Sequence, residues 1–203
     1  MNPALKRWIN PWSVAFVSGL VFLTAMPLLQ RRFLKAPPPV GPLGDWVLAE
    51  AETARPLASS ALLGKVVLAT FAPADCGEDC VERHEGLRRA LSHTDDLGDA
   101  IRLVTFAAPS AVASLRSPSP APRLHLLTGA PEQLEGLAAG VRRCWDAFAG
   151  TDGGSTTGEL LRLPAYMLVD QQGFVRGFWR TDAAGRGNAI NAARLLARHG
   201  VNP

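Results

Sequence analysis

Two cysteines lie four positions apart in the segment Thr70-Phe71-Ala72-Pro73-Ala74-Asp75-Cys76-Gly77-Glu78-Asp79-Cys80, which is the most informative part of the sequence. The residues before it, 64–71, are short, apolar and rich in β-formers after a Gly-Lys turn, which is typical of a buried strand. The residues after it, 81–91, carry apolar side chains at helical spacing. Thiols at a strand-to-helix junction lie beside helix N-terminal amides, which stabilise a thiolate. Because a thiolate is both a nucleophile and a soft metal ligand, the pattern indicates redox or metal chemistry, with a plain stabilising disulfide as the alternative.

The rest of the chain alternates strands and helices around this junction. An edge hairpin is expected at 45–55, strands at 100–107, 123–129, 165–170 and 174–180, and helices at 132–147 and 188–199. A loop with a fragment of helix is expected at 110–121, and a flexible loop at 151–158. This order predicts an α/β domain with a central mixed sheet and helices on both faces. With cysteines after the first long strand, the order resembles a thioredoxin-like three-layer sandwich.

The N-terminal segment predicts a membrane anchor. Residues 12–29 are uncharged, and eighteen helical residues reach roughly 27 Å, about the thickness of the bilayer core. Trp8 and Trp12 lie at one end of this run and Arg31 and Arg32 follow the other. A cleaved secretory signal is the alternative. We therefore expect a tail and single transmembrane helix in 1–35, a stiff Pro-rich linker in 36–44 and the folded domain in 45–203.

The net charge belongs to the tail and not to the domain. The chain carries a formal +3, and its first 35 residues alone carry +5, which leaves −2 for residues 36–203. A nearly neutral domain has no electrostatic footprint for nucleic acid, so we expect no nucleic-acid partner. Basic residues flank both ends of the span, so the positive-inside rule does not orient it. Thiol chemistry of this kind works outside the cytoplasm, which places the domain on the periplasmic or exterior side of the cell membrane.

Several of these features together resemble the Sco (SenC) family. They are the single N-terminal anchor, Leu63-Gly64-Lys65 before the first long strand, the spacing of Cys76 and Cys80, Leu127-Thr128-Gly129 at a strand end, and Tyr166-Met-Leu-Val-Asp-Gln-Gln-Gly173. Members are membrane-anchored, thioredoxin-like proteins that serve assembly of the copper centre of cytochrome c oxidase. The resemblance therefore implies copper as cargo, Cys76 and Cys80 as its thiolate ligands, and a cytochrome c oxidase subunit or another periplasmic protein as the target.

Three departures from the family pattern affect the metal site. Gly77 and Val81 stand where members usually have proline, and 107–112 replace an acidic segment. The copper-binding histidine expected shortly before Tyr166 is missing, since 159–165 read Glu-Leu-Leu-Arg-Leu-Pro-Ala. A thiolate pair suits Cu(I), whereas Cu(II) normally also requires an imidazole.

The chain has four histidines that could substitute for the missing one. His84 shares a helical face with Cys80 four residues earlier, and is the candidate third copper ligand. The other three, His93, His125 and His199, are interpreted as solvated or structural. Leu163-Pro164 instead resembles the cis-proline turn that faces the cysteine pair in thioredoxin and TlpA-like oxidoreductases; an ordinary trans proline at a strand start is the alternative.

Three functions remain open on the sequence. The first is a Sco-like copper metallochaperone, and the second is a membrane-tethered thiol–disulfide oxidoreductase with Cys76 as the attacking thiol. The third is a non-catalytic binding subunit that has lost the metal site. Cys144, next to Trp145 on an amphipathic helix, is expected to be a buried apolar residue without a role in either chemistry.

Overall fold

The computed structural model describes residues 11–33, 36–75, 77–117, 121–149 and 165–199. The chain divides into two compact units, residues 1–35 and residues 36–203. The first contains helix α2 (Pro11–Phe33), and the second contains all the strands described below. Each unit is treated by itself.

A mixed eight-stranded sheet forms the centre of the second unit, in the order β1-β8-β7-β4-β5-β6-β2-β3. Its strands are β1 (Gly41–Pro42), β2 (Val47–Glu50), β3 (Pro56–Ala58), β4 (Val66–Ala72), β5 (Ile101–Ala107), β6 (Leu124–Thr128), β7 (Ala165–Val169) and β8 (Phe174–Arg180). Strands β4, β5 and β6 are parallel, and β7 runs antiparallel to β4. The carboxyl ends of β4 and β5 and the start of β7 therefore lie at one edge of the sheet. All seven residues of β4 are buried, as expected of a central strand covered on both faces.

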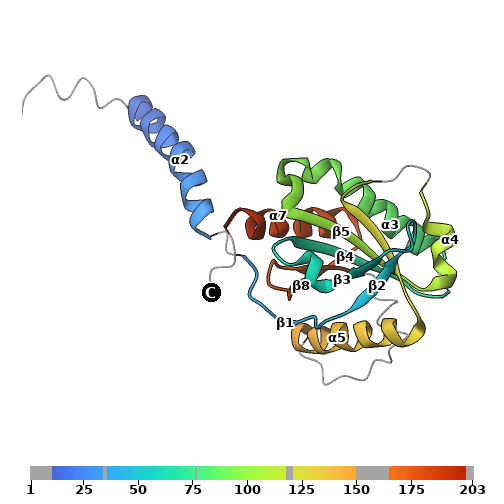
Figure 1. Ribbon diagram of the computed structural model, residues 1–203. Coiled ribbons are helices and arrows are strands. Elements are labelled where there is room, and N and C mark those ends of the chain that lie inside the picture. Colours follow the sequence, from blue (N-terminus) through green and yellow to red (C-terminus); the bar gives the residue numbers. More distant parts are fainter. Residues whose placement is uncertain (1–10, 34–35, 76, 118–120, 150–164, 200–203) are drawn as a thin grey trace, which may run out of the picture. The chain divides into compact units, whose positions relative to one another are not determined.

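Helices cover both faces of this sheet (Figure 1). On one face, α3 (Glu78–Ala90) and α7 (Ala183–His199) pack on β4, β5 and β7 through an apolar cluster that includes Leu87, Leu103 and Leu196. On the other face, α5 (Pro131–Ala149) contributes Leu134, Leu137 and Val141 to a second cluster. The predicted central mixed sheet with helices on both faces is confirmed.

Short connections complete the fold. They are the 3-10 segments η1 (Ser59–Leu62), η2 (Ser92–Ala100) and η3 (Pro109–Ala111), and the one-turn helix α4 (Val112–Leu115). Segment η2 was not anticipated, whereas η3 and α4 agree with the helix fragment expected in 110–121. The last helix begins at Ala183, five residues before the expected start, because the Asp182 carboxylate accepts a hydrogen bond from the Gly185 amide at 2.7 Å. A capping residue, not the apolar pattern, determines where α7 begins.

The segment 36–44, expected to be a linker, packs on the sheet of the second unit. Strand β1 pairs with β8, and the Val40 amide donates to the Val175 carbonyl at 2.7 Å. Leu43 is buried in the cluster beneath α5. The composition of segment 36–44 predicted a stiff spacer. A Pro-rich segment also fits an edge strand, however, because a missing amide donor costs little there.

Helix α2 contains the run that was expected to cross a membrane. It has 23 residues, and its exposed apolar side chains include Trp12, Phe16 and Leu23. Among the described residues, no helix meets the length and apolarity required of a membrane span.

Candidate functional site

Cys80 lies at the sheet edge where β4 and β5 end. This residue occupies the first turn of α3 and is 3% exposed, and its sulfur atom forms a disulfide bond. Its amide donates to the Gly77 carbonyl at 3.1 Å, and Gly77 is the residue that precedes the helix. Cys76 lies outside the described residues, so the close approach of the two sulfurs stays a prediction.

The surroundings of Cys80 are apolar. It belongs to a small cluster with Ala72 from β4, Ala107 from β5, residues of η3 and α4, and Leu126 from β6. The Ala108 amide donates to the Ala72 carbonyl at 2.9 Å and holds the ends of β5 and β4 together beneath it. Apolar surroundings favour an uncharged disulfide or thiol over an isolated thiolate, so Cys80 would be a neutral thiol after reduction until a cation binds.

Charges on α3 lie close to Cys80. Glu78 and Asp79 occupy the first turn, where carboxylates stabilise the helix through its dipole. They also place two exposed negative charges immediately before the cysteine in the sequence. The first turn thus combines a soft sulfur with an acidic surface.

His84, the candidate third ligand, lies one turn after Cys80 and is buried. Its Nδ1 is 2.9 Å from the Thr105 hydroxyl oxygen on β5. Burial lowers the pKa of His84 below its ordinary value. In the described ranges, no three His, Cys, Asp or Glu side chains are grouped as they would be around a metal ion. Ligation by His84 therefore remains a prediction that would require Nε2, since Nδ1 is engaged by Thr105.

We expect His84 to make the stability of the domain depend on pH. Its pKa in the folded protein is below the unfolded value of about 6.5, so the unfolded chain binds a proton that the folded chain does not. The free energy of unfolding should therefore fall as the pH drops below about 6.5, by about 1.4 kcal/mol for each unit between the two pKa values. Urea unfolding of His84→Gln at pH 7.5 and 5.5 should show a smaller pH effect than the parent. His93→Gln, at an exposed position, is the control and should retain the parent's dependence.

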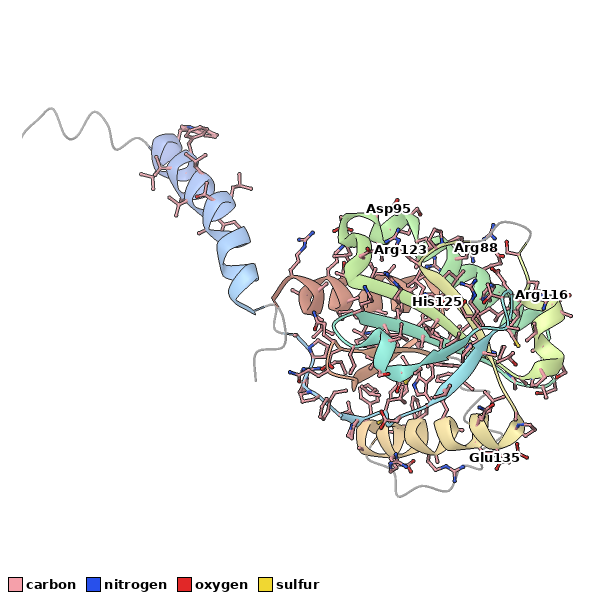
Figure 2. The ribbon with its side chains drawn as sticks, in the orientation of Figure 1. Arg88, Asp95, Arg116, Arg123, His125 and Glu135 are labelled. Carbon is pink, nitrogen blue, oxygen red and sulfur yellow. The ribbon has the colours of Figure 1, made fainter. Side chains whose placement is uncertain are left out.

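The other predicted residues are distributed as follows. His93 is exposed in η2, while Pro164 and the side chain of His199 lie outside the described residues. His125 is not solvated: its Nδ1 is 2.7 Å from Glu50 Oε1 across the β6–β2 contact, and it lies in the sheet (Figure 2). This hydrogen bond lowers the pKa of Glu50. His125 is therefore a structural residue that ties the β2–β3 hairpin to the sheet.

Cys144 is a buried free thiol on the opposite face of the sheet from Cys80. Its Sγ lies 3.6 Å from the Pro42 carbonyl oxygen of β1. Burial raises the pKa of the Cys144 thiol, which keeps it protonated and unreactive. These contacts agree with the expected packing role.

A polar group that the sequence analysis did not identify lies beside Cys80. Arg83, three residues after Cys80, is 9% exposed, and the hydroxyl of Tyr166 at the start of β7 donates to the Arg83 carbonyl at 3.5 Å. Burial raises the pKa of Tyr166, against a hydrogen bond from Arg186 of α7 that lowers it. The sequence position of Arg83 could have indicated its burial, because a helical residue three positions after an inward-facing cysteine faces the same way.

Gly86 allows α3 to approach this group. A Cβ at position 86 would lie directly against the Tyr166 hydroxyl, which belongs to a fully buried ring. We therefore expect Gly86→Ala to lower the free energy of unfolding by roughly 1–3 kcal/mol through overpacking. Gly136→Ala on α5 is the matched control, because a Cβ there meets no atom within 4 Å. It should stabilise the protein by roughly 0.5–1 kcal/mol through helix propensity. Equal effects of both substitutions in urea unfolding would contradict this packing.

Comparison with known proteins gives matches by structure only. No protein-family model matches the sequence, and no curated protein matches it. BsSco, a member of the Sco family of cytochrome c oxidase assembly proteins in which a disulfide switch was identified, aligns with a TM-score of 0.60 at 15% identity, over 81% of this chain and 97% of its own. A SCO1/SenC family lipoprotein from Bacillus anthracis aligns with 0.57 at 16% identity, over 78% and 96%.

A third similar structure is yeast Sco1 with copper bound. It aligns with a TM-score of 0.53 at 14% identity, over 81% of this chain and 96% of its own. At identities this low, the structural similarity establishes a common fold, and function must be argued from the residues of the site. The similarity nevertheless extends over nearly the whole length of all three solved chains. This chain therefore has the thioredoxin-like fold of the Sco structures, with Cys80 at the sheet edge where β4 passes into α3.

Proposed function

We propose that this protein is a membrane-anchored, Sco-like copper metallochaperone that serves assembly of cytochrome c oxidase. The observation that carries the proposal is Cys80, a disulfide-bonded cysteine in the first turn of the helix that follows the central strand of a Sco-type fold. Cys76 is the proposed partner of Cys80 in both the disulfide and the metal site. The copper found in yeast Sco1 supports copper as the cargo.

The side chains suit Cu(I) and not Cu(II). Cys76 and Cys80 supply two soft thiolates, which match the soft Cu(I) ion. No imidazole stands shortly before Tyr166 in the sequence, and the Nδ1 atom of His84 is already hydrogen-bonded to Thr105. Two thiolates bind Cu(I) without a third protein ligand, whereas Cu(II) would lack its preferred nitrogen donor.

Copper loading requires a prior reduction. The disulfide must accept two electrons from a partner dithiol, which itself becomes a disulfide, so that this chain then holds two thiols. Each thiol releases its proton when the metal binds, because the ligand is the thiolate. The acidic first turn, with Glu78 and Asp79, favours the approach of a cation to this position.

The anchor is proposed from the sequence of α2. Its residues 12–29 are uncharged, and its apolar side chains are exposed along the described part of the helix, Trp12 by 81%. An exterior position of the second unit is proposed because the disulfide of Cys80 persists in an oxidising space.

A membrane-tethered thiol–disulfide oxidoreductase is the second candidate, and the buried position of Cys80 favours it. In this mechanism the Cys76 thiolate attacks a target disulfide and displaces one target thiolate, forming a mixed disulfide. Cys80 then attacks Cys76 and displaces the second target thiolate. The target gains two electrons and this chain ends in the disulfide that Cys80 shows. A buried cysteine suits this second, intramolecular step.

Anaerobic metal titration distinguishes these candidates. The full-length chain in detergent, reduced with an excess of dithiol that is then removed, should bind one Cu(I) tightly in competition with a chromogenic chelator. The same protein should bind Cu(II) at least roughly a hundredfold more weakly, because the site lacks an imidazole. Failure to bind Cu(I), together with disulfide exchange toward a model substrate, would instead support the oxidoreductase. Absence of both activities would leave the non-catalytic binding subunit.

A further inference from the structure

The hydroxyl of Tyr166 lies at the junction of α3, α7 and β7, where Arg186 contacts it and Arg83 and Arg89 contribute positive charge. The hydroxyl donates to the Arg83 carbonyl, and Arg186 hydrogen-bonds to it. Arg83 and Arg89 act on it electrostatically as well. The Tyr166 ring is fully buried, Arg186 is half-buried and Arg89 is exposed, so the cluster extends from the core to the surface.

None of these three guanidinium groups forms an ion pair within the described residues. The ion pairs of that part of the chain use other arginines, such as Arg88 with Glu85 and Arg198 with Asp96. Arg83 is more than nine-tenths buried, and its Nε has no hydrogen-bond partner among the described residues. The carboxylate that acts on it most, Asp79, is not within ion-pair distance.

An unpaired buried guanidinium is costly, because the group loses water without gaining an acceptor. Burial lowers the pKa of Arg83, as expected of a cation without a full counter-charge. A neighbouring phenol does not supply that charge, since burial raises the pKa of Tyr166 and keeps it neutral. Within the part of the chain that the structure describes, the cluster therefore lacks an anion.

The backbone lets these groups converge. A Cβ on Gly86 would lie directly against the Tyr166 hydroxyl and 3.3 Å from Arg186 Nη1, so only glycine leaves both polar groups at the surface of α3. Arg186 from α7 and Tyr166 from β7 thus meet at Gly86 of α3, three residues after the buried Arg83.

We propose that Arg83, Arg186 and Tyr166, with Arg89 at the surface, form a binding site for a phosphate group. Guanidinium groups bind phosphate oxygens through paired charge-assisted hydrogen bonds. A dianionic phosphate matches several cations better than the single charge of a carboxylate does. The proposal does not depend on the proposed copper chemistry, because no cysteine belongs to the site.

Isothermal titration calorimetry tests the proposal. The full-length protein in detergent is titrated with inorganic phosphate, and chloride keeps the ionic strength constant. We expect saturable binding that weakens at least about tenfold in Arg83→Met, since a charge-assisted hydrogen bond is lost. Arg186→Gln, at a half-buried position, should weaken it similarly and decides the matter if Arg83→Met does not fold. Arg198→Met, also on α7 but exposed and paired with Asp96 at 2.9 Å, should bind phosphate as the parent does.

Two further ligands define the source and class of the anion. Tighter binding of glycerol 3-phosphate than of inorganic phosphate would indicate a phosphate monoester as the natural ligand, and weaker binding would indicate the free ion. Acetate should not compete at equal concentration. The proposal would be overturned if the parent did not bind phosphate, or if both Arg83→Met and Arg186→Gln bound phosphate as tightly as the parent. Stronger binding of acetate than of phosphate would also overturn it.

Discussion

Replacing Cys80 with serine is expected to abolish Cu(I) binding and disulfide exchange together. A serine hydroxyl is a hard, protonated oxygen at neutral pH and cannot replace a soft thiolate as a ligand or a nucleophile. A single remaining thiolate is a poor site, so the affinity for Cu(I) should fall by several orders of magnitude. Cys76→Ser should have the same effect. Chelator competition and the redox potential of each variant measure the two losses separately.

Cys144→Ser is the matched control for this result. Cys144 is a buried free thiol on the other face of the sheet, so its loss should leave Cu(I) affinity and redox potential unchanged. Stability should fall modestly, because a hydroxyl is buried among apolar groups. In cells, the double variant Cys76→Ser/Cys80→Ser should fail to support oxidase assembly. Full oxidase activity with this double variant would refute both thiol mechanisms and favour the non-catalytic binding subunit.

The elements predicted from sequence were those with a strong hydrophobic pattern. Strand β4 is recognisable as a short continuous apolar run and helix α5 by its apolar side chains at helical spacing, and both form where expected. Strand β1 was missed because two residues in a Pro-rich segment have no pattern, and its pairing with β8 depends on residues more than 130 positions away. The beginning of α7 was missed because the side chain of Asp182, not an apolar periodicity, determines it.

The part of the candidate site that could be predicted from sequence is the part whose chemistry depends on residue type alone. Cys80 was identified because two cysteines at a strand-to-helix junction have few alternative explanations. Arg83 was not identified, because an arginine in a helix is ordinarily solvated. Only the fold reveals that this one is buried and has no ion-pair partner in the described ranges. His125 was assigned to a structural role without its partner, since the contact with Glu50 joins residues 75 positions apart.

Arg176→Met is expected to lower the free energy of unfolding by about 3–5 kcal/mol, the cost of leaving a buried charge unpaired. Arg176 Nε lies 2.6 Å from Asp170 Oδ2, and the Asp170 side chain is fully buried. The other carboxylate oxygen accepts from the Gln172 and Phe174 amides at 2.8 and 3.0 Å, which shapes the β7–β8 turn. Arg176 Nη1 also donates to the Pro37 carbonyl at 3.0 Å, so the same side chain holds segment 36–44 on the sheet.

Arg180→Met on the same strand is the control. Its ion pair with Asp182 spans 3.1 Å, but the Arg180 side chain is 86% exposed, and such a pair contributes at most about 1 kcal/mol. Urea unfolding followed by tryptophan fluorescence compares the two. The double variant Arg176→Met/Asp170→Leu should recover part of the loss, since it leaves no buried charge behind. If Arg176→Met cost no more than Arg180→Met, the Asp170 carboxylate would not depend on its cation, and its two amide donors alone would hold the turn.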